Sequence, residues 1–399
     1  MKKNVSLLIV CLLAIIPFHC YANIAKGTSG SCKWVIDDDG VLTISPSNGE
    51  EGTLEDWGKG STSWFKYCDK ITHAKFEKQI YAKTCYGMFN ACSLLETVDF
   101  GELNIDDCEN MQYMFSGCKS LKSVDISNLN TFNVKYMDCM FYNCTSIENL
   151  DLSTFDVWSV VTMNNMFYNC VSLENLDVSR WDTWKVAEMQ YMFYNCRKLT
   201  NLNLYSWDMG EVLNMNSMFQ NCVSLKNIEM RYFSLYRLGI TKNVFKNCHS
   251  LESLNLTGIY PDAGGDFDGW FTGCESLKKF YALNDDPFMW TISEEMFKTI
   301  EDPGKIILYV PRKSVELYKS APGWSIFDVR AVEDEPKETS DNTGYNGSGT
   351  SSSDNPSTVI CNLTVDNTEW SVIYSLDGKR LSVPKRGINI VNGKKYLIK

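Results

Sequence analysis

The sequence has few histidines and lacks the short signatures of catalytic or nucleotide-binding sites. Three histidines occur in 399 residues, and no two cysteines form a C-x-x-C pair. Zinc sites need cysteine and histidine ligands clustered at short spacings. The motifs G-x-S-x-G and H-E-x-x-H and the P-loop are absent as well. We therefore predict that the chain is not an enzyme and that it uses no cofactor and no metal.

Positive charge is also scarce. The chain has 38 lysines and arginines against 49 aspartates and glutamates, for a net charge of −11. A protein that binds nucleic acid or anionic lipid through its net charge carries the opposite excess. The composition thus excludes nucleic acid as an expected partner and is compatible with a cationic partner or Ca²⁺.

A short apolar run near the start predicts export. Lys2 and Lys3 precede the apolar segment 5–18, and a small residue, Ala22, follows. This is the pattern of a secretory signal peptide cleaved after Ala22. About 14 apolar residues are too few to span a bilayer, and the bulky residues before Cys20 argue against a lipoprotein site. We expect a secreted protein, extracellular or on the outer cell surface, with no transmembrane segment in the mature chain.

A regular repeat occupies most of the chain. Ten phenylalanines stand in register, separated first by 24 residues and then, from Phe89 to Phe297, by 26 each time. Cysteine follows nine of them by three residues. The predicted core ladder consists of Phe65, Cys68, Phe89, Cys92, Phe115, Cys118, Phe141, Cys144, Phe167, Cys170, Phe193, Cys196, Phe219, Cys222, Phe245, Cys248, Phe271 and Cys274. A fixed period of 20–29 residues is typical of a solenoid of stacked coils.

The pattern inside one repeat predicts its secondary structure. Met163, Met166, Phe167 and Cys170 lie at positions i, i+3, i+4 and i+7, which is one face of a short helix. Residues 176–178 alternate inward and outward as a strand does. We therefore predict an α/β leucine-rich-repeat solenoid of about ten coils, with short parallel strands on one face and short helices on the other.

Different segments flank the repeats. Two β runs around Asp39-Gly40 predict a hairpin that covers the first coil, and a strand and short helix after residue 304 predict a cover for the last. The region after residue 332 is acidic and then rich in glycine and serine, which predicts a disordered linker. The predicted organisation is 1–22 signal peptide, 23–63 N-terminal cap, 64–300 leucine-rich repeats, 301–332 C-terminal cap, 333–358 linker and 359–399 small β-rich tail.

The repeat resembles that of a known family. The segment Met140 to Ser153 follows Met-Phe-x-x-Cys-x-x-Leu-x-x-Leu-Asp-Leu-Ser, with Ile147 in one leucine position. This is similar to the BspA-like leucine-rich-repeat surface proteins with Treponema-type repeats, over about residues 64–300. The resemblance implies surface display and adhesion to host matrix or neighbouring-cell proteins. The tail around 373–395 resembles C-terminal tails of exported bacterial proteins that act in sorting.

One position departs from common leucine-rich repeats. Three residues after the strand, asparagine or cysteine is replaced by larger apolar residues. They are Leu129, Phe155, Trp181, Trp207, Phe233 and Ile259. We therefore expect an apolar ladder at this turn instead of an asparagine ladder.

Polar residues recur in the outward position of the strand, and we predict that they form the ligand-binding face. They are Asp99, Asp125, Asp151, Asp177, Asn203, Glu229 and Asn255. Four aspartates in adjacent strands repel one another. One interpretation is a cation site or a face for a basic partner. The other is that each carboxylate accepts local hydrogen bonds and belongs to the folding pattern of the repeat.

Aromatic and sulfur side chains supply further candidates. Tyr142, Tyr168 and Tyr194 form a column that either binds a partner or covers the coil edges. The ladder cysteines point in parallel, so bridging them would be strained and we expect mostly reduced thiols. The register places Cys85 and Cys108 inward on adjacent coils, which makes them a candidate disulfide. Cys139 falls in a position predicted to face solvent.

Taken together, these features predict a secreted or surface-displayed leucine-rich-repeat protein that binds another protein, such as a host extracellular-matrix or cell-surface protein. The alternative is a structural, self-associating spacer of a surface layer, without a specific host ligand. Either way, positions that repeat identically in every coil serve the scaffold, and partner specificity belongs to positions that vary.

Overall fold

The computed structural model describes residues 23–204, 206–229, 239, 241–257, 267–287 and 296–336, and four short strands between 373 and 398. The chain divides into two compact units, 1–335 and 336–399. The predicted signal peptide, nearly all of the predicted linker, and Phe233 and Ile259 of the apolar turn lie outside the described residues.

The first unit begins with a hairpin that continues into the solenoid. Strands β1 (Asn23–Ser29), β2 (Cys32–Asp37) and β3 (Val41–Pro46) pair antiparallel in sequence order. The turn between β2 and β3 contains Gly40, whose φ of 81° suits glycine. Strand β3 then pairs parallel with β5 (His73–Phe76), and β5 with β7 (Thr97–Asp99). The hairpin thereby supplies the first coil with a hydrogen-bonded neighbour.

A second small sheet runs beside the first. Strands β4 (Glu51–Thr53), β6 (Gln79–Tyr81) and β8 (Glu102–Asn104) pair parallel in that order. One 3-10 turn, η1 (Phe65–Tyr67), precedes β5. Each early coil therefore contributes a strand to two sheets, and the apolar side chains between the sheets form the core.

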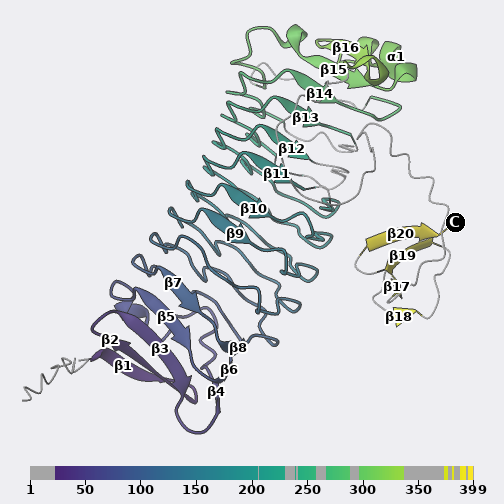
Figure 1. Ribbon diagram of the computed structural model, residues 1–399. Coiled ribbons are helices and arrows are strands. Elements are labelled where there is room, and N and C mark those ends of the chain that lie inside the picture. Colours follow the sequence, from purple (N-terminus) through teal and green to yellow (C-terminus); the bar gives the residue numbers. More distant parts are fainter. Residues whose placement is uncertain are drawn as a thin grey trace, which may run out of the picture. The chain divides into compact units, whose positions relative to one another are not determined.

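Later coils each contribute one short parallel strand, and Figure 1 shows these strands stacked along the unit. Strand β9 (Asn149–Asp151) pairs with β10 (Asn175–Asp177), and β11 (Asn201–Asn203) with β12 (Asn227–Glu229). Partner residues are 26 apart, so Leu150 stands beside Leu176. The predicted solenoid of short parallel strands is confirmed.

The last sheet combines repeat strands with the segment that follows the repeats. Its order is β13 (Ser253–Asn255), β14 (Lys279–Tyr281), β15 (Ile307–Val310) and β16 (Asp328–Ala331), all parallel. Between β15 and β16 lie the 3-10 turn η3 (Arg312–Ser314) and helix α1 (Val315–Ser320). The turns η2 (Pro303–Lys305) and η4 (Val332–Asp334) flank this region.

Nine phenylalanines stack through the core from Phe89 to Phe297. Consecutive rings lie 5.3–6.0 Å apart, as between Phe193 and Phe219 at 5.3 Å. The structure corrects the predicted ladder at its first position, because Phe65 is 38% exposed and its neighbour Trp64 is fully buried. The shorter first step of 24 residues changes the register, so the ladder begins at Phe89.

Apart from the 3-10 turn η1 in the first coil, the described coils contain turns in place of the predicted short helices. In the coil of Phe141, the amides of Met137, Cys139, Phe141 and Asn143 donate to carbonyls of the next coil at 2.8–3.0 Å. The amides of Met140 and Tyr142 instead donate to the carbonyl three residues earlier in the same coil and close tight turns. An α-helix would satisfy these amides internally. Apolar residues at i, i+3, i+4 and i+7 suit both arrangements, so the spacing alone did not distinguish them.

Two residues in each of these coils have a left-handed backbone conformation and produce the succession of turns. One position has positive φ at Gly87, Tyr113, Cys139, Asn165, Tyr191, Ser217, Asn243 and Gly269. The other has positive φ at Ala91, Gly117, Asn143, Asn169, Asn195, Asn221, Asn247 and Gly273. Glycine and asparagine tolerate this conformation best. Because a left-handed residue ends a right-handed helix, these two positions exclude the helical alternative.

The second unit contains a four-stranded antiparallel sheet. Its strands are β17 (Ile373–Ser375), β18 (Arg380–Leu381), β19 (Gly387–Val391) and β20 (Lys394–Ile398), in the order β18-β17-β19-β20. These strands lie within the predicted β-rich tail, 359–399, whose first residues, 359–372, lie outside the described structure.

Candidate functional site

The strand face presents its polar residues to solvent. Asp99, Asp125, Asp151, Asp177 and Asn203 are exposed, and Asn255 is half-buried. The side chain of Glu229 lies outside the described structure, although its backbone belongs to β12. The alternation arises because successive strand residues point to opposite sides, with Leu150 and Leu202 buried behind the polar positions.

Each described aspartate of this face closes a local turn. Oδ1 of Asp177 accepts hydrogen bonds from the amide of Ser179 at 3.0 Å and from its hydroxyl at 2.7 Å. Asp125 makes the same two contacts with Ser127, and Asp99 and Asp151 accept the amide two residues ahead. The serine hydroxyls, and then the amides, lower the pKa of Asp125 and Asp151. These local hydrogen bonds are the ones that the folding interpretation expects of these carboxylates.

The strand face is hollowed where its sheet is interrupted. Strand β10 pairs with β9 and β11 with β12, and no pairing joins β10 to β11 within the described strands. At this place Leu176 is half-buried, whereas its equivalents Leu150 and Leu202 are 3% exposed. An open groove of about 410 Å³ spans the interruption. It is lined by Asn149, Leu150, Asp151, Ser153, Glu174, Asn175, Leu176, Asp177, Thr200 and Asn201.

The groove combines an apolar floor with an acidic, amide-rich rim. Asn175 donates through Nδ2 to Oδ1 of Asn149 at 2.7 Å. Glu174 pairs with Lys198 at 2.8 Å, while Asp151 and Asp177 contribute carboxylates on adjacent strands. The lining has carboxylates, amides and hydroxyls and contains no histidine or cysteine. Such a surface suits the binding of a polar or cationic segment and lacks a nucleophile–base pair.

The aspartate column does not converge on a common ion. Within the described residues, three carboxylates within 4.8 Å of one another occur at Asp37, Asp38 and Asp39, in the β2–β3 turn. There, Oδ1 of Asp37 accepts hydrogen bonds from the amides of Asp39 and Val41. The three carboxylates are therefore close together because they belong to one hydrogen-bonded turn. The cation-site interpretation of the strand-face column thus gains no geometric support.

The opposite face carries the predicted tyrosine column. The rings of Tyr142, Tyr168 and Tyr194 stack at 4.8 and 4.7 Å and are half-buried. They stand beside a ladder of asparagine amides, in which Nδ2 of Asn169 donates to Asn143 at 2.8 Å. The tyrosines therefore cover the coil edges at least in part.

The cysteines of the described residues are all buried, and no disulfide joins any two of them in this structure. From Cys118 to Cys274 the ladder thiols donate to phenylalanine carbonyls of the preceding coil, as Cys170 does to Phe141 at 3.1 Å. Burial raises the pKa of Cys170 to about 12. Cys139 is 8% exposed, which corrects the prediction that it faces solvent. Cys85 and Cys108 are in contact, and their hydrogen bond and burial raise the pKa of Cys85. A disulfide between them stays a prediction.

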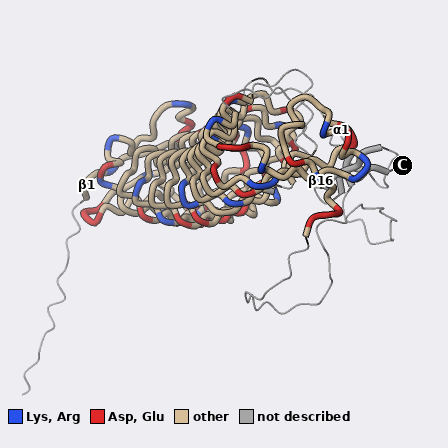
Figure 2. The backbone as a smooth tube through the Cα atoms, turned by 90° about the horizontal axis from the view of Figure 1, so that it is seen from above, with Lys and Arg blue, Asp and Glu red and all other residues tan. Residues whose placement is uncertain are grey.

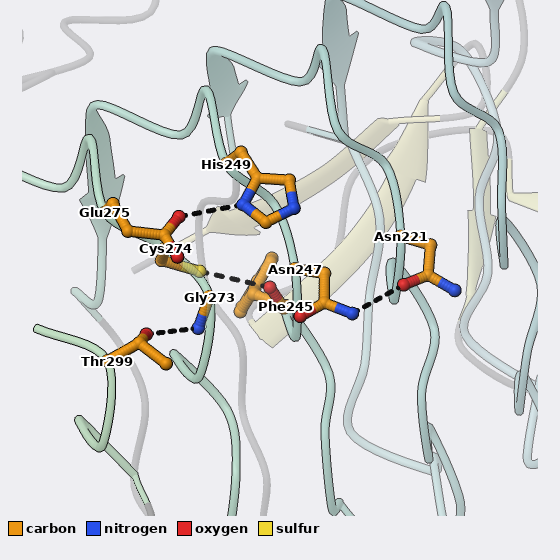
Figure 3. Close-up of polar contacts among 8 residues, drawn as sticks. All are labelled: Asn221, Phe245, Asn247, His249, Gly273, Cys274, Glu275 and Thr299. Atoms are coloured by element: carbon orange, nitrogen blue, oxygen red, sulfur yellow. Dashed lines mark hydrogen bonds and ion pairs between the residues drawn. The ribbon is translucent and has the colours of Figure 1, made fainter.

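Polar ladders between coils were missed by sequence reasoning. Figure 3 shows Asn247 donating to Asn221, Cys274 to the carbonyl of Phe245, and His249 paired with Glu275 at 2.8 Å. The signal was available: asparagine immediately precedes five consecutive ladder cysteines at 26-residue steps, from Asn143 to Asn247. The predicted apolar ladder is real at the strand turn, where Leu129, Phe155, Trp181 and Trp207 are buried. The asparagines occupy a different turn.

Comparison with known proteins finds one family model of unknown function and solved structures of leucine-rich proteins. A family model described as "Mycoplasma protein of unknown function, DUF285" matches residues 78–175 and 148–257. A leucine-rich-repeat protein from Eubacterium ventriosum shares 18% identity over 74% of this chain and 83% of its own, with a TM-score of 0.33. A leucine-rich cell surface protein from Faecalibacterium prausnitzii shares 17% identity over 68% and 92%, with a TM-score of 0.23. No curated protein matches.

Proposed function

We propose that this protein is an exported, surface-displayed leucine-rich-repeat protein that binds a protein partner through its strand face. The observation that carries the proposal is the groove at the interruption between β10 and β11. It supplies an apolar floor at Leu176 and a polar rim in one place, the combination expected of a binding surface. The apolar run near the start supports export, and no described helix is long and apolar enough to cross a membrane.

Charge favours a partner with basic side chains. The carboxyl side chains of Asp151 and Asp177 are exposed on adjacent strands, and Asp125 precedes them by one coil. In Figure 2 acidic and basic positions are interspersed along the outer edges of the coils, so the negative charge is not uniform. The three aspartates therefore form a local acidic row. Complementary charge mainly increases the association rate and the specificity of such an interface.

An array of extracellular-matrix and cell-surface proteins, probed with the full chain, tests the proposal. For a bound protein, the triple variant Asp125→Asn, Asp151→Asn, Asp177→Asn should weaken affinity about tenfold, roughly 1.4 kcal/mol. Asparagine Oδ1 can still accept the turn hydrogen bonds, so the fold should be retained. The effect should shrink as salt is raised.

A matched control removes the same charge elsewhere. Glu50, Asp69 and Glu316 are exposed, lie outside the strand face and pair with nearby lysines. Their replacement by Gln, Asn and Gln should leave affinity unchanged. Equal binding by both triple variants would refute the strand face as the contact surface. Concentration-dependent self-association by light scattering, with no bound protein on the array, would instead support the surface-layer spacer.

A further inference from the structure

We propose that Cys68 and Cys92 form a disulfide that fastens the first coil to the second. The structure places their two Sγ atoms 2.8 Å apart, closer than two unbonded sulfur atoms normally approach. Both side chains are in the core, Cys68 at 5% exposure and Cys92 fully buried. Closing the bond requires the sulfur atoms to approach by a further ~0.8 Å.

Cys92 differs from the cysteines that follow it in the ladder. In each later coil the thiol donates to the carbonyl of the phenylalanine 29 residues earlier, at 3.0–3.2 Å. These thiols belong to Cys118, Cys144, Cys170, Cys196, Cys222, Cys248 and Cys274. The thiol of Cys92 is instead directed at the sulfur of Cys68.

The register change at the first coil explains this difference. Its step is 24 residues, so position 63, which lies 29 residues before Cys92, is a serine and not a ladder phenylalanine. Trp64 fills the core there and donates through Nε1 to the carbonyl of Met88 at 2.9 Å. The shorter step therefore shifts the position at which each later thiol meets a phenylalanine carbonyl, and at the first coil the two sulfur atoms face each other instead.

The chemistry is thiol–disulfide exchange with an external oxidant such as oxidised glutathione or an oxidised dithiol oxidoreductase. The Cys68 thiolate attacks the oxidant disulfide, forms a mixed disulfide and releases one thiol. The Cys92 thiolate then attacks Sγ of Cys68, forms the bridge and releases the second thiol. Two electrons and two protons pass to the oxidant, and the bridge remains.

Burial decides when this exchange occurs. Burial, and then the neighbouring Cys68 sulfur, raise the pKa of the Cys92 thiol, so it is a poor nucleophile in the folded protein. We expect slow oxidation of the native chain and rapid bridging while the first coils fold. Closing the 68–92 loop before folding is complete restricts the unfolded chain and stabilises the first coil.

The test is thiol mapping after refolding the full chain with reduced and oxidised glutathione. Remaining thiols are alkylated in denaturant, and peptides are identified by mass spectrometry. The expected result is a peptide pair linked through Cys68 and Cys92, with the cysteines from Cys118 to Cys274 alkylated. Alkylation of both Cys68 and Cys92, or a bridge from either to another cysteine, would overturn the proposal.

Variants separate this bridge from the neighbouring Cys85–Cys108 pair. In a Cys85→Ala background, reductant should lower the Tm by a few degrees. Cys92→Ser should abolish that reductant effect, while the ladder control Cys144→Ser should keep it. A reductant effect that persists in Cys92→Ser would contradict the proposal. Because the readout is covalent, its outcome is independent of whether the strand face binds a partner.

Discussion

Single asparagines before the ladder cysteines serve two purposes at once. Asn169 has a φ of 60°, donates to Asn143 at 2.8 Å and accepts from Asn195 at 2.5 Å. The positive φ fits a left-handed turn, and the two side-chain hydrogen bonds link three coils. Two independent requirements, a left-handed backbone and an amide ladder, therefore favour asparagine at this position of the scaffold.

Substitutions at Asn169 should separate these contributions. Asn169→Gly removes the amide and keeps the backbone relaxed, whereas Asn169→Ala also incurs the left-handed penalty of about 1–2 kcal/mol. We therefore expect both variants to be destabilised in urea unfolding, with alanine the worse by that amount.

The strand residue Asn175 provides the matched control. It makes a similar amide contact with Asn149 at 2.7 Å, but in extended backbone. At position 175, replacement by glycine should lower the free energy of unfolding more than replacement by alanine, because glycine weakens a strand. The same rank order at both positions would contradict the assigned role of positive φ.

Sequence reasoning at the residue scale succeeded where every coil repeats the same environment. The phenylalanines from Phe89 onward are buried as expected. The predictions for Phe65 and Cys139 were wrong, because these residues keep the repeat spacing but have different surroundings from the other coils. Phe65 belongs to the coil with the shorter step, and Cys139 occupies a turn covered by its neighbours.

At the element scale, the strand and its following turn form one unit. The aspartate at the end of the strand caps the turn through its Oδ1, and the pKa of Asp125 and Asp151 is lowered as a result. A lowered pKa means that the folded state binds the proton less readily than the unfolded state. The resulting stabilisation is complete above the ordinary value of 3.8 and is lost as the pH falls through the lowered pKa.

Acid titration of stability tests this unit. Between pH 5 and pH 3 the urea midpoint of the wild-type chain should fall, and the variant Asp125→Asn, Asp151→Asn should show a shallower fall. Because both carboxylates are exposed, solvent screening limits each contribution to less than about 1 kcal/mol. An unchanged slope in the double variant would show that the turn hydrogen bonds do not depend on the charge.

The face opposite the strands is where element prediction failed. Spacing of i, i+3, i+4 and i+7 in the coil of Phe141 fits a helix, but the amides of that segment bond alternately to the next coil. Whether an amide bonds within its own coil or to a neighbour is decided by the stacking of coils. The recurring asparagine and glycine positions were the evidence in the sequence for turns.

At the scale of the whole first unit, each coil contacts mainly its neighbours. Stability in such a solenoid is approximately a sum of nearest-neighbour terms, so damage at one end should remain local. Trp324 is fully buried beneath the last strands and packs edge-on against Tyr318 at 5.2 Å. Trp64 is the buried tryptophan at the opposite end.

Hydrogen exchange of Trp324→Ala tests this locality. Truncation of a buried tryptophan costs about 3–5 kcal/mol, and protection should fall in β14, β15 and β16 while β5 and β7 keep their protection. Trp64→Ala should show the reverse pattern. A uniform loss of protection in either variant would mean that the unit unfolds as one cooperative block.

The amino-acid sequence alone determined the period, the inward and outward alternation of the strands and the segments that flank the repeats. These follow from residue size and polarity at fixed spacing, which need no knowledge of neighbours. Tertiary structure decided the turns in place of helices, the start of the ladder after Phe65, the contact between Cys68 and Cys92 and the groove beside Leu176. Each of these depends on how one coil is seated on the next, because hydrogen bonds and contacts between coils join residues that are 24 to 29 positions apart.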